Sequence, residues 1–405
     1  MDVTKRERVE NFKKLGFGVF VHFGLYSVMG DGEWTKHFHG ISDAEYEKFA
    51  PRFNPEPDWA DKLVRAAAEA GAKYIVLTAR HHDGFSLYDT RGLSDYDAPH
   101  FCGRDLAREY VDACNRRGIV PFFYHTTLDW RHPDFDADFP AYQKYLRASV
   151  EILCKHYGKI GGLWFDGNWS KRDADWEEDA LYGLIRGAQP DAIIVNNTGL
   201  DSRGAAGHTE IDSVTFERGR PDAAASNSLG AEMCETVGGT WGYAGRDMDF
   251  KSMRDLLTSY MTCRRFGANF LLNVGPRGDG ELPDGYKEVL RSFGLWNRAY
   301  AQAVAGTRPA DFEVSGDGFI LTDGVGYYLF NGNLNMAGDP NVAICKGGPE
   351  NMSVLNFTAQ VKRVVWLDNG EELAYTQQRG LLTVACTDFS YGVNYLWRVA
   401  KIEVH

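Results

Sequence analysis

Over roughly the first 300 residues, short apolar runs alternate with longer amphipathic stretches. Eight apolar runs have the length of a β-strand: residues 17–23, 74–80, 119–125, 162–166, 192–197, 212–217, 231–237 and 269–274. Strands alternating with helical segments are typical of βα units and a parallel sheet. No G-x-G-x-x-G motif follows a strand, so a dinucleotide-binding sheet is disfavoured. The pattern predicts the α/β class and a closed (β/α)8-like barrel.

The sequence predicts one helix in detail, over positions 59–70. Its apolar side chains recur every three or four positions and therefore share one face: Trp59, Leu63, Ala67 and Ala70. Asp58 is placed to cap the first turn, and Gly71 is placed to end the helix.

Beyond residue 300 the pattern changes to short alternating runs between turns rich in Gly, Asn and Asp. These runs are residues 318–322, 326–330, 353–357, 361–367, 381–385 and 394–399. Short strands at this spacing predict an antiparallel β-sandwich. We therefore predict a barrel domain over residues 1–300, a linker over 301–310 and a C-terminal β-sandwich over 311–405. We expect the sandwich to serve packing and stability, with an accessory sugar-binding role as the alternative.

Charge and cysteine usage narrow the class of partner. The chain of 405 residues has a formal charge of −12 and 44% hydrophobic residues, which is ordinary for a globular protein. An acidic chain without basic clusters argues against nucleic acid and an anionic membrane as the main partner. The seven cysteines are scattered and never spaced C-x-x-C, which indicates reduced thiols and no zinc site. No apolar run follows the charged first residues, so we expect a cytoplasmic protein, while a removed signal stays possible.

Polar residues collect at the predicted ends of the strands, where barrel enzymes place their working groups. The sharpest case is the segment 161–167, GGLWFDG, in which an apolar run ends in Asp166. Cleaving a glycosidic bond with retention needs two carboxyl groups, a nucleophile and an acid/base. Asp166 fits the first role, although a helix cap or an ion pair would explain it equally well from spacing alone.

Two glutamates compete to be the acid/base. Glu217 stands beside Arg218 and Arg220, which would favour its ionised form. Glu232 has apolar neighbours, where desolvation would raise its pKa toward the range of a working acid. We therefore prefer Glu232 and keep Glu217 as the alternative.

Histidines and aromatic residues complete the candidate site. Adjacent histidines on a strand point to opposite faces, so His81 and His82 are unsuited to share a metal ion, and we predict neither a metal nor a cofactor. We expect them to donate hydrogen bonds to sugar hydroxyls. Aromatic side chains beside polar groups can pack on the apolar face of a sugar; the candidates are Trp34, Tyr124, Trp130, Trp164, Trp169, Trp241 and Tyr243.

Seven motifs in order give the chain a family resemblance. They are FVHFGLYS at 20–27, EW at 33–34, AGAKY at 70–74, HHDGF at 81–85, LWFDG at 163–167, WGY at 241–243 and FLLNVGP at 270–276. Together they resemble the α-L-fucosidases of glycoside hydrolase family 29. The resemblance implies a retaining exo-hydrolase that removes terminal α-L-fucose from a fucosylated oligosaccharide or glycoconjugate, with a barrel followed by a β-sandwich.

The resemblance also carries residue roles. It implies that Asp166 is the nucleophile and, because a glutamate precedes W-G-Y by nine positions in the family, that Glu232 is the acid/base. The family's fucose-binding residues match His22, Trp34, His81, His82 and Tyr124. We add Glu33, Trp164 and Trp241 as further candidates for substrate binding.

The chain departs from the family pattern in two places. The family's W-E-T reads Ala231-Glu232-Met233 here, and the arginine that commonly follows strand five is replaced by Thr198, so that Arg203 or Arg246 would have to supply it. Two other functions stay open: an inactive fucose- or glycan-binding protein, and an exo-glycosidase of another specificity such as an α-galactosidase. The linkage cleaved and the oligomeric state are not indicated by the sequence.

Overall fold

The computed structural model describes residues 4–226, 228–339, 341 and 350–405. The chain forms two compact units, Met1–Lys251 with Ala268–Arg291, and Ser252–Gly267 with Ser292–His405. The predicted boundary near residue 300 therefore differs from the division observed. The predicted linker begins inside helix α12 (Asp284–Val304) and ends at the short strand β9 (Arg308–Pro309).

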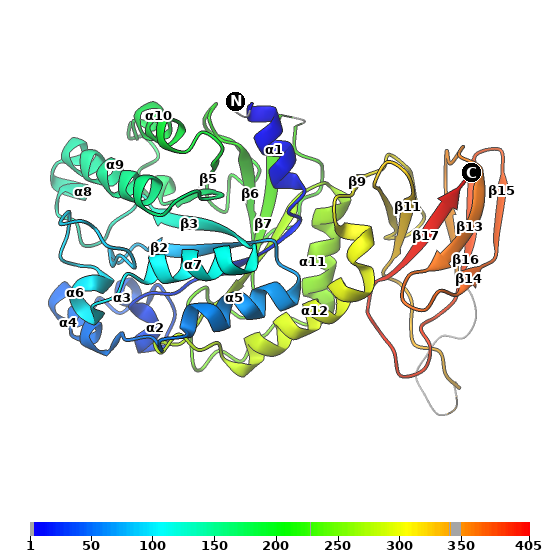
Figure 1. The fold of residues 1–405 in the computed structure, drawn as a ribbon, viewed down its shortest axis with the longest axis horizontal. Helices are drawn as coiled ribbons and strands as arrows, with labels where there is room; N and C mark the ends of the chain where they lie inside the picture. The colour runs from blue at the N-terminus through cyan, green and yellow to red at the C-terminus, as the bar shows by residue number, and fades with distance from the viewer. Residues whose placement is uncertain (1–3, 227, 340, 342–349) are drawn as a thin grey trace. The chain divides into compact units, whose positions relative to one another are not determined.

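The first unit contains a closed barrel in which each strand pairs with the next and β8 pairs with β1 (Figure 1). All eight predicted strands are confirmed to within two residues at either end. They are β1 (Phe17–Val21), β2 (Tyr74–Arg80), β3 (Val120–Thr126), β4 (Gly162–Asp166), β5 (Ile193–Asn197), β6 (Ser213–Glu217), β7 (Gly230–Thr236) and β8 (Asn269–Val274). Every described pairing between them is parallel, as the βα pattern predicts.

Four long helices connect the first five strands: α5 (Trp59–Ala70), α7 (Leu106–Arg117), α9 (Phe139–His156) and α10 (Glu178–Ala188). Figure 1 shows α5 and α7 outside the strands, where they also contact each other. Shorter segments are α1 (Lys5–Lys13), α2 (Tyr26–Met29), α3 (Thr35–Phe38), α4 (Asp43–Tyr46), α6 (Ala98–Cys102), α8 (Asp134–Ala137), and the 3₁₀ turns η1 (Glu47–Arg52) and η2 (Asn168–Lys171). Within the described residues, loops alone join β5 to β6 and β6 to β7, so the barrel is (β/α)8-like with two helices missing.

Helix α5 has the predicted bounds but not the predicted cap. Gly71 ends it in a left-handed conformation with φ of +96°, where a residue without a Cβ is favoured. Asp58 makes no capping hydrogen bond, so that prediction is wrong. Its carboxylate instead lies 2.9 Å from the ammonium of Lys62, one turn into the helix.

Bulky side chains fill the inside of the barrel. The cluster contains Phe12, Phe20, Tyr74, Val76, Phe122, Tyr124, Trp164, Ile193, Val195, Cys234 and Leu271, all buried. Phe12 comes from α1 and packs within 6 Å of the rings of Tyr74 and Phe122. The aromatic rings of Phe20, Tyr124 and Trp164 belong to this core and also line a pocket at the strand ends.

Strand β4 begins with glycine because its neighbours leave no room for a side chain. A Cβ on Gly162 would lie 2.3 Å from the carbonyl oxygen of Ile193 on β5 and 2.6 Å from the ring of Phe122. The carbonyl belongs to the ladder between β4 and β5 and cannot move without breaking the pairing. The same strand ends in Asp166, so this close approach fixes the backbone that carries the carboxylate.

Gly162→Ala should lower the free energy of unfolding by about 1–3 kcal/mol, because the added methyl group overpacks a site closed by backbone. The matched control is Gly183→Ala on α10, where no atom lies within 4 Å of the added Cβ. Alanine is the better helix former, so the control should be neutral or stabilising by up to about 1 kcal/mol. Urea unfolding of the three proteins measures the difference, and equal midpoints for both variants would contradict the packing argument.

The second unit holds two antiparallel sheets, in the orders β14-β13-β17-β11-β10-β9 and β12-β16-β15. Their strands are β10 (Phe319–Thr322), β11 (Tyr327–Asn331), β12 (Glu350–Val354), β13 (Val361–Trp366), β14 (Glu372–Leu373), β15 (Tyr375–Gln378), β16 (Leu381–Cys386) and β17 (Arg398–Val404). Buried residues of both sheets form one core, so the sandwich is confirmed. Helix α11 (Met253–Arg265) groups with this unit. The sequence missed β9, β14 and β15, whose exposed positions break the apolar alternation.

Three further features concern the described chain as a whole. Of the six cysteines in the described residues, all are free and five are buried; Cys345 lies outside them. No described helix combines the length and apolar character required to cross a bilayer. Among the described residues, no three His, Cys, Asp or Glu side chains are grouped so that they could hold a metal ion.

Candidate active site

A pocket of about 430 Å³ lies where the barrel strands end. Its lining comes from strand ends and the loops that follow them: Phe20, His22, Trp34, His81, His82, Tyr124, Trp164, Asp166, Trp169, Arg172, Asn197, Gly199, Leu200, Asp201, Glu217 and Trp241. The volume suits a single small ligand such as one sugar ring. Most of the candidate residues predicted from the sequence therefore meet in one place.

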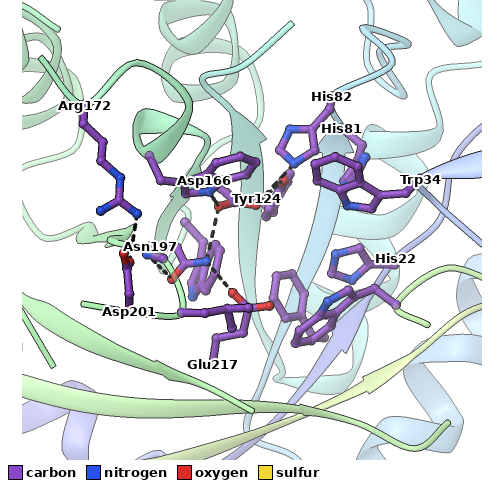
Figure 2. Close-up of a pocket in the computed structure, with 16 residues that line it drawn as sticks. His22, Trp34, His81, His82, Tyr124, Asp166, Arg172, Asn197, Asp201 and Glu217 are labelled. Atoms are coloured by element: carbon purple, nitrogen blue, oxygen red, sulfur yellow. Dashed lines mark hydrogen bonds and ion pairs between the residues drawn. The ribbon is translucent and has the colours of Figure 1, made fainter. Parts of the chain in front are cut away.

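Asp166 occupies the centre of the polar groups in this pocket (Figure 2). Its Oδ1 accepts hydrogen bonds from Trp169 Nε1 at 2.7 Å and from Asn197 Nδ2 at 3.2 Å. Its Oδ2 accepts from the Tyr124 hydroxyl at 3.1 Å and lies 3.5 Å from Nε2 of His82. Four groups thus hold the carboxylate in one orientation: two from strands β3 and β5, one from the loop after β2 and one from η2.

These neighbours also keep Asp166 ionised. Burial by itself would raise the pKa of its carboxyl group, but His82, Trp169 and Tyr124 together lower the pKa below its ordinary value. A carboxylate that is partly buried, ionised and aimed into a pocket is the arrangement expected of a nucleophile.

Glu217 stands beside Asp166 at the end of the next strand but one, and the two share a donor. Asn197 Nδ2 lies 3.2 Å from Oδ1 of Asp166 and 2.8 Å from Oε2 of Glu217, so these two oxygens can be at most about 6 Å apart. Asn197 is itself fixed, because its Oδ1 accepts from the Thr215 hydroxyl at 3.1 Å. Retaining glycosidases separate their carboxyl groups by about 5–5.5 Å and inverting ones by about 6.5–9.5 Å. The observed limit fits a retaining pair.

The environment of Glu217 favours its protonated form. Burial, and after it the negative charge of Asp166, raise the pKa of Glu217 above its ordinary value, although Asn197, Arg218 and Arg203 act in the opposite direction. Arg218 favours the ionised form of Glu217, as the sequence indicated, but burial and the charge of Asp166 outweigh it. The Arg218 guanidinium lies 5.2 Å over the ring of Trp241 and donates to the Gly239 carbonyl at 2.8 Å.

Glu232, the preferred acid/base from the sequence, does not line the pocket. It is 1% exposed inside the barrel, where it accepts hydrogen bonds from the Tyr74 hydroxyl and from Trp164 Nε1, the latter at 2.9 Å. Its surroundings are apolar, as predicted, and burial raises its pKa to about 7. However, Oε1 of Glu232 already accepts the hydrogen bond from Trp164, whose side chain lines the pocket. The geometry therefore disfavours Glu232 and favours the alternative, Glu217.

Three histidines contribute to the pocket, and two of them are held neutral. Burial lowers the pKa of His22 to about 3 and that of His81 well below its ordinary value. Nδ1 of His22 lies 2.6 Å from Oδ1 of Asn273, whose amide nitrogen donates to the Trp241 carbonyl at 2.7 Å. The Asn273 oxygen can only accept, so Nδ1 carries the proton and Nε2 of His22 is left as an acceptor. Nδ1 of His81 is buried and has no hydrogen-bond partner in the described structure, and the His81 side chain lines the pocket.

The adjacent histidines do not point to opposite faces as expected. The rings of His81 and His82 lie 4.2 Å apart, and both line the pocket. The prediction was wrong because β2 ends at Arg80, so neither histidine belongs to regular strand. His82 is oriented by Thr126, whose hydroxyl lies 2.7 Å from Nδ1.

The chain is similar in sequence and fold to known α-L-fucosidases. The family model of α-L-fucosidase matches residues 1–302. Tissue α-L-fucosidase of Rattus norvegicus is 29% identical over 74% of this chain and 70% of its own length, and α-L-fucosidase of Dictyostelium discoideum is 26% identical over 72% and 70%. The structure of α-L-fucosidase isoenzyme 1 from Paenibacillus thiaminolyticus is 30% identical, covers 99% of this chain and all of that one, and superposes with a TM-score of 0.85.

This chain belongs to the α-L-fucosidase family. It is thus a glycoside hydrolase with the barrel and C-terminal antiparallel sheets found in its structural relatives. A trapped covalent intermediate of a Bacteroides thetaiotaomicron α-L-fucosidase, with 2-fluoro-fucosyl fluoride, has the same fold at a TM-score of 0.83 and 23% identity.

The remaining predicted sugar contacts divide into pocket walls and supports. Trp34, Trp164 and Trp241 line the pocket of this α-L-fucosidase family member. Glu33 does not; its Oε2 accepts from the backbone N–H groups of Trp241 at 3.0 Å and of the following glycine at 2.7 Å. It therefore supports the turn that presents Trp241, and we no longer expect it to bind the sugar directly.

Sequence reasoning missed several groups at the pocket. Asn197 lies next to the position where the family commonly has an arginine, and it donates to both Asp166 and Glu217. Of the two arginines considered as substitutes, Arg203 donates to the Glu217 carbonyl and Arg246 pairs with Asp31 at 2.9 Å. At the rim, Arg172 and Asp201 form an ion pair at 2.8 Å (Figure 2). Leu200, which precedes Asp201 in the sequence, is exposed and also lines the pocket. Trp169 was noted only as an aromatic residue; its position three residues after Asp166, in η2, was the available signal.

Proposed function

We propose that this member of the α-L-fucosidase family hydrolyses terminal α-L-fucose by double displacement, with Asp166 as nucleophile and Glu217 as acid/base. The observation that carries the proposal is the single amide nitrogen of Asn197 placed between the two carboxylates. It keeps the two oxygens that it contacts within about 6 Å of each other, closer than the carboxyl groups of inverting enzymes. The covalent intermediate captured in the Bacteroides relative supports the same course.

The pocket supplies each step of this reaction. Asp166 attacks the anomeric carbon while Glu217 donates its proton to the leaving oxygen. The glycosyl ester that forms is then hydrolysed by water, from which Glu217 removes a proton. His22, with its free Nε2 acceptor, and His81 are placed for sugar hydroxyls, and the rings of Trp34 and Trp241 supply apolar walls for the ring face and methyl group.

The leaving group would sit at the outer rim. Arg172, Leu200 and Asp201 line this side of the pocket, and all three are exposed. We propose that a fucosylated oligosaccharide or glycoconjugate places its next sugar against them. Because their contacts are with the leaving group alone, they are the residues expected to influence which linkage is cut.

The pH dependence of kcat/KM should be bell-shaped and acidic. Asp166 must be ionised, and its pKa lies below the ordinary 3.8, so activity should fall only at low pH. Glu217 must be protonated, and its pKa lies above the ordinary 4.5, so activity should fall as pH rises through that raised value. Hydrolysis of an aryl α-L-fucoside across pH tests this. A profile that keeps rising with pH would contradict the assignment of Glu217 as the acid.

The stereochemistry of the first product tests double displacement. Incubation with an aryl α-L-fucoside, followed by proton NMR, should show α-L-fucose before mutarotation. The first appearance of β-L-fucose would overturn the retaining mechanism. Release from an aryl α-galactoside with no release of fucose would indicate the other specificity, and fucose binding without turnover would indicate an inactive binding protein. A panel of α-1,2, α-1,3/4 and α-1,6 fucosylated glycans then identifies the linkage.

A further inference from the structure

Glu232 is a buried carboxyl group for which the proposed reaction has no use. It lies on the inward face of β7, 1% exposed, between Tyr74 of β2 and Trp164 of β4. One oxygen faces each partner: Oε2 accepts from the Tyr74 hydroxyl and Oε1 from Trp164 Nε1. A buried carboxyl group is costly, so its presence at this depth calls for a role.

Trp164 is the partner that connects Glu232 with the pocket. An indole N–H is a donor only, and a buried donor without an acceptor destabilises the conformation that buries it. Glu232 supplies that acceptor, 2.9 Å away on the core side of the ring. The rest of the indole lines the pocket. The hydrogen bond therefore sets the rotation of a ring that forms part of the substrate-binding wall.

The orientation of Trp164 reaches the nucleophile through one further ring. Tyr124 stacks on Trp164, with ring centroids 5.7 Å apart and planes inclined by 22°. The Tyr124 hydroxyl donates to Oδ2 of Asp166 at 3.1 Å. Phe20 packs against both rings, 5.1 Å from Trp164 in an edge-on contact and 5.9 Å from Tyr124. A rotation of the indole would displace the ring that carries a hydrogen bond to Asp166.

We propose that Glu232 is a positioning residue that orients Trp164 and, through it, the Tyr124 hydroxyl at Asp166. The inference rests on the proposed function and assigns this glutamate a role other than acid/base. It also explains why the partner on the far side is a tyrosine. A hydroxyl can donate to a carboxylate or accept from a carboxylic acid, so Tyr74 satisfies Oε2 in either protonation state. Trp164 keeps its acceptor throughout.

Two variants of Glu232 separate positioning from acid/base chemistry. In Glu232→Gln the amide oxygen can still accept from Trp164 and the amide nitrogen can donate to Tyr74, so kcat/KM should stay within about threefold of wild type. Glu232→Met preserves volume but removes the acceptor, and it should lower kcat/KM about 10- to 100-fold. The loss should be equal for an activated aryl fucoside and for a fucosylated glycan, and azide should not restore it.

Trp164→Phe tests the same contact from the other side. It removes the indole N–H, so the double variant Glu232→Met/Trp164→Phe should fall no further than Trp164→Phe alone. Additive losses would overturn the proposal. Should Glu232→Met fail to fold, Trp164→Phe carries the test by itself, and wild-type kinetics for it would overturn the proposal.

The remaining outcomes distinguish this inference from the proposed function. If the wild-type protein releases no fucose, the proposed function fails, and the affinity of fucose for wild type and the two Glu232 variants then tests positioning alone. If the wild type is active but Glu232→Met matches it, the positioning role fails. Azide rescue of Glu232→Met, or an equal loss in a folded Glu232→Gln, would also reject positioning and return Glu232 to proton transfer.

Discussion

Replacing Asp166 with glycine should lower kcat/KM for an aryl α-L-fucoside by at least about 10⁴-fold, because the glycosyl ester can no longer form. The loss should be chemical and not structural. The carboxylate is held by Trp169, Asn197, Tyr124 and His82 but carries no part of the barrel ladder through its side chain. Thermal unfolding of the variant should therefore remain cooperative, with a melting temperature close to that of wild type.

Azide should restore part of the activity of Asp166→Gly. The glycine leaves space for a small anion on the face from which the carboxylate attacked, while Glu217 still protonates the leaving oxygen. One displacement in place of two gives β-L-fucosyl azide, the inverted product. Detection of that compound by NMR confirms the role of Asp166. Near wild-type turnover without azide, or an α-configured azide, would contradict it.

The barrel was predictable because the apolar runs that form it are long and nearly uninterrupted. A parallel strand buried on both faces needs a continuous apolar run, and β2 and β8 are buried at every position. The strands of the sandwich were harder to predict from the sequence. Its strand β15 alternates half-buried and exposed residues, and only pairing with β16 gives it a strand conformation. Such edge strands are determined by their neighbours and carry little signal of their own.

The position of a residue at the end of a strand predicted that it lies near the pocket, but it did not predict how deep in the barrel its side chain lies. Glu217 pairs in register with Cys234, two residues beyond Glu232 on β7. Side chains two positions apart share a face, so Glu232 lies one layer lower, inside the core. Apolar sequence neighbours correctly predicted its raised pKa but could not show that the side chain ends at Trp164 instead of the pocket.

The hydrogen bonds between side chains at the ends of different barrel strands could not be predicted from the sequence. The Asn197 side chain donates hydrogen bonds to Asp166 and Glu217, which are 31 and 20 residues away along the chain. The residues around Asn196 and Asn197 do not indicate which of the two side-chain amides faces into the barrel, because that depends on the register of β5 with β4. The family resemblance directed attention to a missing arginine, and the structure shows that an amide lies beside the nucleophile instead.

Glu217→Ala should affect substrates according to their leaving groups. A fucosylated glycan needs its leaving oxygen protonated, so kcat/KM should fall about 10²- to 10⁴-fold. An aryl fucoside with a strongly acidic phenol departs without that help, and its first step should be much less impaired. The second step also needs a base, so the glycosyl enzyme should accumulate and give a burst of phenol. Stopped-flow release of the phenol measures both steps.

Azide and pH distinguish Glu217 from Glu232 as the proton donor. In Glu217→Ala, azide needs no base and can enter beside the vacated carboxyl, so it should react with the glycosyl enzyme and yield α-L-fucosyl azide, with retained configuration. The basic limb of the pH profile should disappear in the same variant, because the group that titrates there is gone. Glu235→Gln is the matched control: this glutamate on β7 pairs with Lys251 at 3.3 Å, lies outside the pocket lining and should leave the basic limb in place. If Glu217→Ala keeps the basic limb and Glu232→Ala loses it and yields the α-azide, proton transfer belongs to Glu232 and reaches the substrate by a rearrangement of Trp164.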